Sequence, residues 1–308
     1  MKPWSFVFVA DIQVGSPRSF RYAPAWVENW RTAREQIIAL NPEVVLVGGD
    51  LTRDAWLDAH FYELEAIKAD LDGLPMPYCV TPGNMDVGNK HAERQGAFDN
   101  RDDVANNMSS ERLQRLCSLF GPHCWSLVHK NVRFSAFTSM LPGSGLPEEA
   151  AFWAWMEAQR DAPRAEHHVW MSHYPLFIEA PDEPNWDMTK REEYHAWYFG
   201  MDEPHRSRIL DILRETGADL YLSGHVHCRK RYEVDGIVFD LGPATCFSQW
   251  ADRWEDGDPA LGFMRYEVAE DGIHGAFVPL REVSNAQGYG PGGHPKPEDR
   301  DYSIAWEK

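Results

Sequence analysis

Short apolar runs alternate with longer amphipathic segments in the first 80 residues. Residues 6–10 (Phe-Val-Phe-Val-Ala) and 44–47 (Val-Val-Leu-Val) are continuous apolar runs, the pattern of strands buried on both faces. Residues 25–40 and 54–71 place apolar side chains at helical spacing, and residues 78–80 form a short third strand. Three strands separated by two helices predict a βαβαβ unit.

The second part of the chain predicts a mixed sheet. Residues 125–129 and 132–138 flank a Lys-Asn pair, which favours a β-hairpin, whereas the polar residues 88–110 predict a loop. We expect further helices at 110–120, capped by Ser109, and at 147–159 and 208–216, with strands at 168–173, 220–227, 231–234, 237–241 and 262–268.

The sequence predicts one domain with an insertion and a C-terminal tail. We expect a single domain over residues 1–281, an aromatic-rich insertion at about 180–205, and a tail at 282–308 whose glycines and prolines exclude regular structure. The apolar start is too short and lacks the cleavage pattern of a signal peptide, and no apolar stretch is long enough to span a bilayer. These features predict a cytoplasmic protein.

The composition and net charge of the chain limit the kinds of molecule that it can bind. The chain has 308 residues, of which 43% are hydrophobic, enough for a sizeable core. Its formal net charge of −18 argues against general nucleic-acid binding and against an anionic membrane surface, so a phosphorylated substrate needs a local positive centre. The five cysteines are scattered, which predicts reduced thiols, and Cys228 is expected to be a buried structural thiol.

Polar side chains recur directly after the apolar strands. Ligands of open α/β sheets bind at the carboxyl ends of strands. Each residue alone has an ordinary alternative, such as a helix cap for Asp50 or a turn for Asn84, but the repetition at five strand ends argues against coincidence. His225 and His227 are two apart on an extended segment and therefore point the same way. The set comprises Asp11, Gln13, Asp50, Asn84, His173, His225 and His227.

This set of side chains predicts two metal ions. Two carboxylates, two amides and three imidazoles exceed the needs of one divalent ion and suit two, with Asp50 as the natural bridge. Nitrogen and oxygen ligands without thiolate favour Mn²⁺, Fe, Zn²⁺ or Co²⁺ over Ca²⁺. Two ions roughly 3.5–4 Å apart activate water and clamp a phosphoryl group.

Five short motifs follow one another within residues 5–250. They are Asp11-x-Gln13, Gly49-Asp50, Gly83-Asn84-x-Asp86, His173 and Gly224-His225-x-His227. Together they resemble the calcineurin-like metallophosphoesterase superfamily. The resemblance implies an α/β (α+β) fold, a double β-sandwich of mixed sheets flanked by helices, and hydrolysis of a phosphate ester by a hydroxide that bridges two metal ions.

The resemblance also implies roles for residues. One ion would be held by Asp11, Gln13, Asp50 and His227, and the other by Asp50, Asn84, His173 and His225. The expected catalytic residues are Asp50, Asn84, Asp86 and His173.

Two positions depart from the superfamily pattern. Gln13 replaces the usual histidine, and a neutral amide oxygen should bind the first ion more weakly and shift it toward Mn²⁺ or Mg²⁺. Met85 replaces the histidine that protonates the leaving oxygen, a function worth about 10²–10⁴-fold. Three interpretations follow: a substrate with a good leaving group, another acid among His91, His195 and His205, or a metal-binding protein with little turnover.

The expected substrate is a small phosphorylated molecule. We expect a substrate with a good leaving group, most simply a phosphodiester or pyrophosphate, or else an aryl phosphate; a phosphomonoesterase or protein phosphatase is a further alternative, and Met85 disfavours the latter. Arg18, Arg21 and His195 are candidate substrate-binding residues, although loop arginines are often only solvated. Aromatic residues in the insertion could stack on a nucleotide-like substrate or form the core of a cap.

Overall fold

Two mixed β-sheets packed face to face form the body of the molecule. The computed structural model describes residues 2–57, 60–92, 106–291, 294 and 296–299. In the five-stranded sheet the order is β11-β10-β1-β2-β3, and in the six-stranded sheet it is β4-β5-β6-β7-β9-β8. The strands are β1 (Trp4–Val9), β2 (Val44–Val47), β3 (Tyr78–Val80), β4 (Trp125–His129), β5 (Val132–Ala136), β6 (His167–Met171), β7 (Leu220–Ser223), β8 (Lys230–Val234), β9 (Ile237–Leu241), β10 (Gly262–Ala269) and β11 (Gly272–Pro279).

Alternation along β1 explains why it is apolar throughout. Phe6 and Phe8 point between the sheets and pack with side chains of the other sheet such as Phe134. Val7 and Val9 point outward into the core beneath the helices. Both faces of β1 are therefore buried, as the continuous apolar run predicted.

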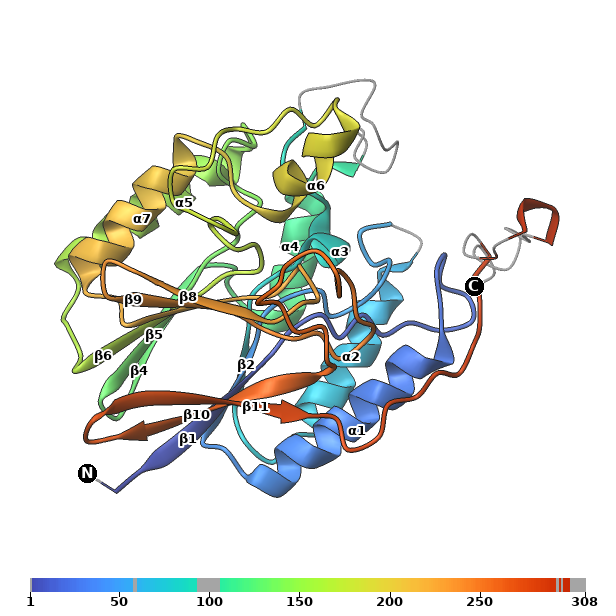
Figure 1. Cartoon of the computed structure of the whole chain (residues 1–308), viewed down its shortest axis with the longest axis horizontal. Coiled ribbons are helices and arrows are strands. Elements are labelled where there is room, and N and C mark those ends of the chain that lie inside the picture. Colours follow the sequence, from blue (N-terminus) through green and yellow to red (C-terminus); the bar gives the residue numbers. More distant parts are fainter. Residues whose placement is uncertain (1, 58–59, 93–105, 292–293, 295, 300–308) are drawn as a thin grey trace.

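Helices cover the outer face of each sheet, so the layers run helix, sheet, sheet, helix (Figure 1). In Figure 1, α1 (Pro24–Leu40) and α2 (Tyr62–Asp72) flank the five-stranded sheet, and α5 (Pro147–Ala158) and α7 (His205–Thr216) flank the other. The predicted double sandwich flanked by helices is confirmed. Further helical segments are α3 (Asn84–Val87), α4 (Ser110–Phe120), α6 (Arg191–Phe199) and the 3₁₀ turns Gln159–Asp161 and Pro297–Asp299.

Most predicted elements occur, with several corrections. The βαβαβ unit is present, since β1, β2 and β3 pair in parallel, and Ser109 caps α4 by accepting from the backbone N–H of Arg112. The second helix begins only at Tyr62, because residues 54–57 form turns. β11 was not predicted, since its glycines and histidine hide the alternation. In the expected irregular tail, Pro297–Asp299 forms one 3₁₀ turn, closed by a hydrogen bond from Asp299 N–H to the carbonyl of Lys296.

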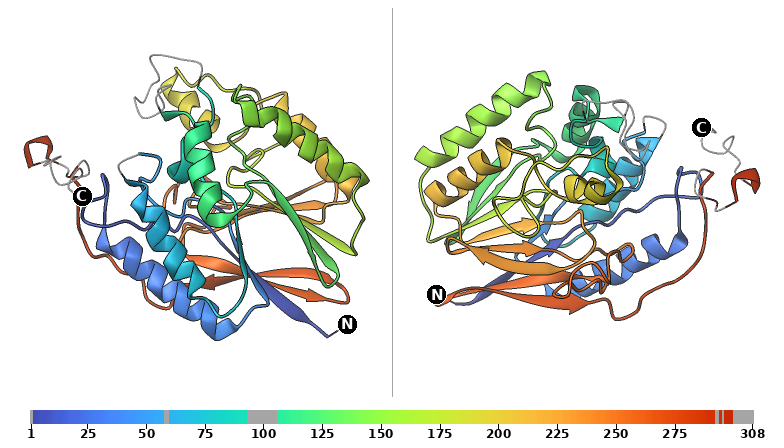
Figure 2. Two further views of the ribbon diagram at one scale, coloured as in Figure 1. Left: turned by 180° about the vertical axis from the view of Figure 1, so that it is seen from behind. Right: turned by 45° about the horizontal axis from the view of Figure 1, so that its top comes forward.

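The segment after β11 runs along α1 (Figures 1 and 2). Ala25 N–H donates to the carbonyl of Ala286 at 3.3 Å, and Ser284 N–H donates to Asn29 Oδ1 at 2.7 Å. The first part of the Gly- and Pro-rich segment is thus fixed beside the N-terminal turns of α1. No helix within the described ranges is long and apolar enough to cross a membrane.

Candidate metal centre

The loops after five strands converge at one edge of the two sheets. Their backbones take an unusual conformation, because five candidate ligands have left-handed φ between 48° and 73°. Side chains other than glycine avoid this region, and such residues cluster at functional sites. Glycines permit the close approach: a Cβ on Gly83 would lie 2.1 Å from Asp50 N, and one on Gly224 would lie 2.6 Å from Asp11 Oδ2. The five left-handed residues are Asp11, Gln13, Asp50, His225 and His227.

The histidine pair reaches the site in a way that differs from the sequence prediction. β7 ends at Ser223, so His225 and His227 lie on a loop and not on an extended segment. Their φ angles of 73° and 56° turn both side chains toward the site. Strand alternation was therefore the wrong reason for their convergence. Cys228 is buried in an apolar cluster with Val226 and Leu241, as predicted for a structural thiol.

The two groups of candidate ligands share Asp50. Asp50, His173 and His225 offer ligand atoms within 4.8 Å of one another, and so do Asp11, Asp50 and His227. All five side chains are buried. These are the carboxylate and imidazole members of the two predicted ligand sets.

Each of the three histidines donates one ring N–H to a backbone carbonyl. His173 Nδ1 donates to Gly48 at 2.8 Å, His225 Nε2 to Tyr198 at 2.9 Å, and His227 Nδ1 to Phe247 at 2.9 Å. A carbonyl only accepts, so the second ring nitrogen of each neutral histidine keeps its lone pair for the site. Metal-ligating histidines are held by such contacts. This donor set fits divalent cations bound by nitrogen and oxygen.

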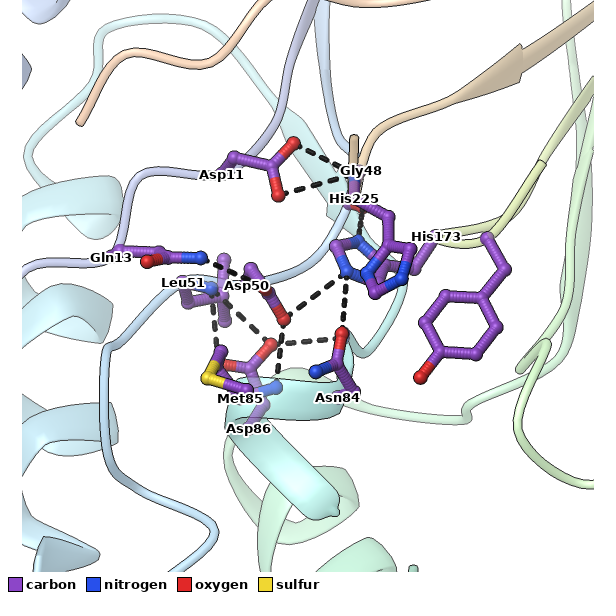
Figure 3. A network of polar contacts seen from close by, with 12 residues as sticks. Asp11, Gln13, Gly48, Asp50, Leu51, Asn84, Met85, Asp86, His173 and His225 are labelled. Carbon is purple, nitrogen blue, oxygen red and sulfur yellow. Dashed lines mark hydrogen bonds and ion pairs between the residues drawn. The ribbon is translucent and has the colours of Figure 1, made fainter. Parts of the chain in front are cut away.

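Asn84 directs its amide oxygen toward the site (Figure 3). Its Oδ1 lies 3.1 Å from His173 Nε2, which also lies 3.2 Å from Asp50 Oδ1. Its amide nitrogen donates to Asn89 Oδ1 and to the Tyr198 hydroxyl, both at 3.0 Å. These two acceptors fix the oxygen as the atom that faces a cation.

Gln13 has the opposite orientation. Its amide nitrogen donates to Asp50 Oδ2 at 2.9 Å and lies 3.2 Å from His227 Nε2. Its oxygen accepts from Arg53 Nη1 at 2.7 Å. A guanidinium has only donors, so Arg53 requires the oxygen on its side. To serve as the predicted ligand, Gln13 must turn its amide and give up this bond.

The charges around Asp50 show how the buried carboxylates are balanced. Burial raises the pKa of Asp50, but the charges of His173 and His225 and the hydrogen bonds it accepts outweigh burial and lower it to about 2. Burial lowers the pKa of His173, whereas Asp50 and Asp11 raise it to about 9. The protonated imidazole of His173 thus supplies the positive charge that a metal ion would supply, and binding an ion would release this proton.

Asp86 links the loops that carry Asp50 and Asn84. Its carboxylate accepts from the backbone N–H groups of Leu51 at 3.0 Å, Thr52 at 3.1 Å and Gly83 at 2.9 Å. Burial and the charge of Asp50 raise the pKa of Asp86 to about 7. The structure therefore gives Asp86 a positioning role.

A pocket of about 510 Å³ opens over the centre. Arg21, His195 and Met85 line it, but His91 and His205, the other proposed acids, line a separate cavity. Arg18 lies over the ring of Tyr62 at 5.0 Å and is not among the residues that line the pocket. Its role in substrate binding stays a prediction. Aromatic side chains of the predicted insertion and the loop after β9 also line the pocket: Tyr194, Tyr198 and Trp250.

Two of the residues that hydrogen-bond the amides of Gln13 and Asn84 were not predicted. Arg53 follows Asp50 by three positions, and this proximity to a motif was the only signal in the sequence. Burial and then the charge of Arg21 lower the pKa of Arg53 to about 10, so it stays charged at neutral pH. Asn89 orients Asn84 from a segment that looked like an ordinary polar loop.

Comparisons with known proteins identify the family to which the chain belongs. A family model described as calcineurin-like phosphoesterase matches residues 5–229. A search of curated proteins gives no match. Similar solved structures include a purple acid phosphatase from yellow lupin (Lupinus luteus) seeds, with a TM-score of 0.60 and 13% identity over 93% of this chain. This chain spans only 53% of the lupin enzyme.

Two other structures match nearly end to end. A dimetal phosphatase from Danio rerio has a TM-score of 0.53 and 14% identity, over 90% of this chain and 99% of the other. GAP50, the anchor in the inner membrane complex of Plasmodium, has a TM-score of 0.57 and 13% identity, over 93% and 89%. At such identities the likeness is one of fold. The family model, however, matches well over half of the chain and includes all of the ordered motifs, so the chain belongs to the calcineurin-like phosphoesterase family.

Proposed function

We propose that the chain hydrolyses phosphate esters or anhydrides with good leaving groups, with two divalent metal ions as cofactors. The observation that carries the proposal is the set of three histidines, each held by a backbone carbonyl and grouped around Asp11 and Asp50, with Asp50 common to both groups. Bound divalent ions would supply an activated water and positive charge for the phosphoryl oxygens. They would also give this acidic protein the local positive field that an anionic substrate requires.

The protein's own residues define how the leaving group departs. Met85 lies in the pocket beside Arg21, whose Nη2 is 3.5 Å from the Met85 sulfur. Neither side chain transfers a proton at neutral pH, because arginine stays protonated and a thioether has no proton to give. Arg21 can only donate hydrogen bonds to a departing oxygen. This favours aryl phosphodiesters and pyrophosphates, whose leaving groups depart without protonation, over alkyl esters.

His195 is the remaining proton donor among the three histidines considered. It lines the pocket, and its ring centroid lies 4.5 Å from that of Trp250. We assign it a contact with the substrate, together with Tyr194 and Tyr198 of the same helix. A small, nucleotide-like phosphorylated molecule fits this aromatic lining.

Turnover measurements with defined metals test the function. The protein, stripped and reloaded with Mn²⁺, Fe²⁺, Zn²⁺ or Co²⁺, should hydrolyse bis(p-nitrophenyl) phosphate faster than an alkyl phosphomonoester. Metal content measured on the same samples should approach two ions per chain. Bound metal without turnover on any phosphate ester would contradict the proposal and favour a metal-binding protein on this scaffold.

A further inference from the structure

A second cavity lies behind the metal pocket and shares two arginines with it. This cavity, of about 900 Å³, is the larger of the two and is lined in part by Trp26, Asn29 and Phe247. Arg21 and Arg53 line both cavities. The two guanidinium groups therefore lie on the wall between the metal centre and a space large enough for a drug-sized ligand.

Arg21 and Arg53 differ in how their charges are balanced. Arg21 is paired with Asp54, through Nε at 2.9 Å and Nη2 at 2.7 Å, and its Nη1 has no hydrogen-bond partner among the described residues. Arg53 forms no ion pair with any carboxylate in the part of the chain that the structure describes. The one polar contact of its guanidinium group there is the neutral amide oxygen of Gln13, and its buried Nε has no partner among the described residues.

Arg21 and Arg53 line the same two cavities, and Asp54 is the one described carboxylate that is paired with either guanidinium group, which leaves an excess positive charge. Arg53 packs against aromatic rings, with its Cζ 5.6 Å from the ring centroid of Trp26 and 5.3 Å from that of Phe247. Those rings cover part of the half-buried side chain, and a partly desolvated cation without a counter-ion is unfavourable. The carboxylate of Asp258 in the larger cavity does not supply the balance, because it is paired with Arg229 at 2.5 Å.

We propose that Arg53 and Arg21 form a subsite for a second phosphate of the substrate, so that the substrate is a phosphoanhydride of the type X–P–O–P–Y. This inference rests on the proposed hydrolase function and specifies its substrate class. The amide of Gln13 contacts Asp50 with its nitrogen and Arg53 with its oxygen, so only this amide separates the two side chains. A second phosphate, bonded to the phosphate that reacts beside Asp50, can therefore reach Arg53. Guanidinium groups match phosphate oxygens in geometry and charge. The rest of the leaving group enters the larger cavity.

The chemistry of this step balances without a general acid. The oxygen of water forms a bond to the phosphorus at the metal centre, and the bond from that phosphorus to the bridging oxygen breaks. The electron pair stays on the bridging oxygen, which becomes part of the phosphate held by Arg21 and Arg53. One proton of the water stays on the new P–OH group and the other passes to solvent. A phosphate monoester has a second pKa of about 6, so it leaves as an anion. The reaction therefore does not need a proton donor at the position of Met85.

Ligand binding tests the subsite independently of turnover. Isothermal titration calorimetry of the full chain, at a fixed excess of Mn²⁺, compares methylenediphosphonate, with two linked phosphorus centres, and methylphosphonate, with one. Loss of a charged hydrogen-bonding group should weaken methylenediphosphonate by about 10–100-fold in Arg53→Gln and leave methylphosphonate within about threefold. Arg53→Lys should fall between wild type and Arg53→Gln. Equal losses for both ligands, or no loss for either, would overturn the subsite.

Kinetics with a matched control separate this inference from the proposed function. Arg53→Gln should raise KM for diadenosine diphosphate far more than KM for the p-nitrophenyl ester of thymidine monophosphate, which has one phosphate. Arg208→Gln is the control, since Arg208 also lies over a tryptophan, 4.0 Å from the ring of Trp153, but pairs with Glu157 outside both cavities. If wild type hydrolyses neither substrate, the proposed function fails, and the calorimetric ratio still decides the subsite. Circular dichroism confirms that each variant is folded.

Discussion

The two sides of the metal centre each contain an amide side chain, and the two amides face opposite ways. Asn84 gives its nitrogen to two acceptors, Asn89 and Tyr198, so its oxygen faces the site. Gln13 gives its oxygen to Arg53, so its nitrogen faces the site. The neighbours of an amide, and not its identity, thus decide whether it can bind a cation. We expect the Asn84 side to bind metal tightly and the Gln13 side to bind it weakly.

Removing the carboxylate that both sides share should have the largest effect. Asp50→Asn keeps the size of the side chain but removes the charge that bridges the two groups of ligands. Hydrolysis should fall by about 10²–10³-fold or more, and metal content should approach zero. Elemental analysis and a phosphodiesterase assay measure both. Two tightly bound ions in this variant would refute the bridging role. Asp72→Asn, at an exposed carboxylate paired with Lys68, is the control.

Substituting each of the two histidines of the Gly-His-x-His motif should affect a different side of the metal centre. His225→Ala should remove the ion shared with Asn84 and His173, whereas His227→Ala should remove the ion beside Asp11. Because the Gln13 side is the weaker one, His225→Ala should eliminate the tightly bound ion and cost more activity, about 10²-fold or more. Metal analysis after desalting, with Mn²⁺ electron paramagnetic resonance, distinguishes them. Loss of the same ion in both variants would mean that the centre is not divided in this way.

Substituting the residues that orient the two amides should change metal affinity in opposite directions. Asn89→Ala releases the Asn84 amide and should weaken metal binding on that side by about 10–100-fold. Arg53→Met frees the Gln13 oxygen and removes a nearby positive charge, so metal binding on the other side should become tighter. Competition titrations with a chelating dye give both affinities. The same sign of change in both variants would contradict the comparison.

Restoring a histidine at position 85 should have a smaller effect on activity. Met85→His introduces a proton donor in the pocket and should raise hydrolysis of alkyl phosphomonoesters more than that of aryl diesters. The gain should be about tenfold, below the usual 10²–10⁴-fold of a general acid, because Arg21 disfavours the protonated imidazole. Leaving-group series measured on Met85→His and on the matched control Met85→Leu check this. Equal gains on both substrate classes would show that Met85 does not limit leaving-group range.

The sequence could predict what depends on local pattern. The apolar runs of β1 and β2 predicted buried strands and the polar residues after them the two carboxylates, whereas the imidazoles follow β6 and β7; the structure brings these side chains together. The positive φ of His225 and His227 was not predictable from alternation, because it depends on the approach of Asp11, which accepts from His225 N–H at 2.9 Å. The partner of Gln13 was equally hidden, since side-chain contacts between separate loops leave no spacing in the sequence.

A buried carboxyl behind the Gln13 side gives the last prediction, which concerns stability. Glu63 is buried and accepts from the backbone N–H of Asp54, the residue that pairs with Arg21. Burial raises the pKa of Glu63 from 4.5 to about 8. The folded state therefore holds this proton more tightly than the unfolded state. The stability that this gives is fully present below about pH 4.5 and is lost as the pH rises through about 8.

Glu63→Gln keeps a neutral side chain of the same size at every pH. Its free energy of unfolding, relative to wild type, should therefore increase between pH 5 and pH 8 by an amount of the order of a few kcal/mol. Urea denaturation at the two pH values measures the change, and Glu65→Gln, at an exposed position of the same helix, should show none. Parallel pH profiles for wild type and Glu63→Gln would mean that Glu63 is ionised in the fold. In that case the negative charge behind Arg21 would be larger than Asp54 alone supplies, and the excess positive charge on the Gln13 side correspondingly smaller.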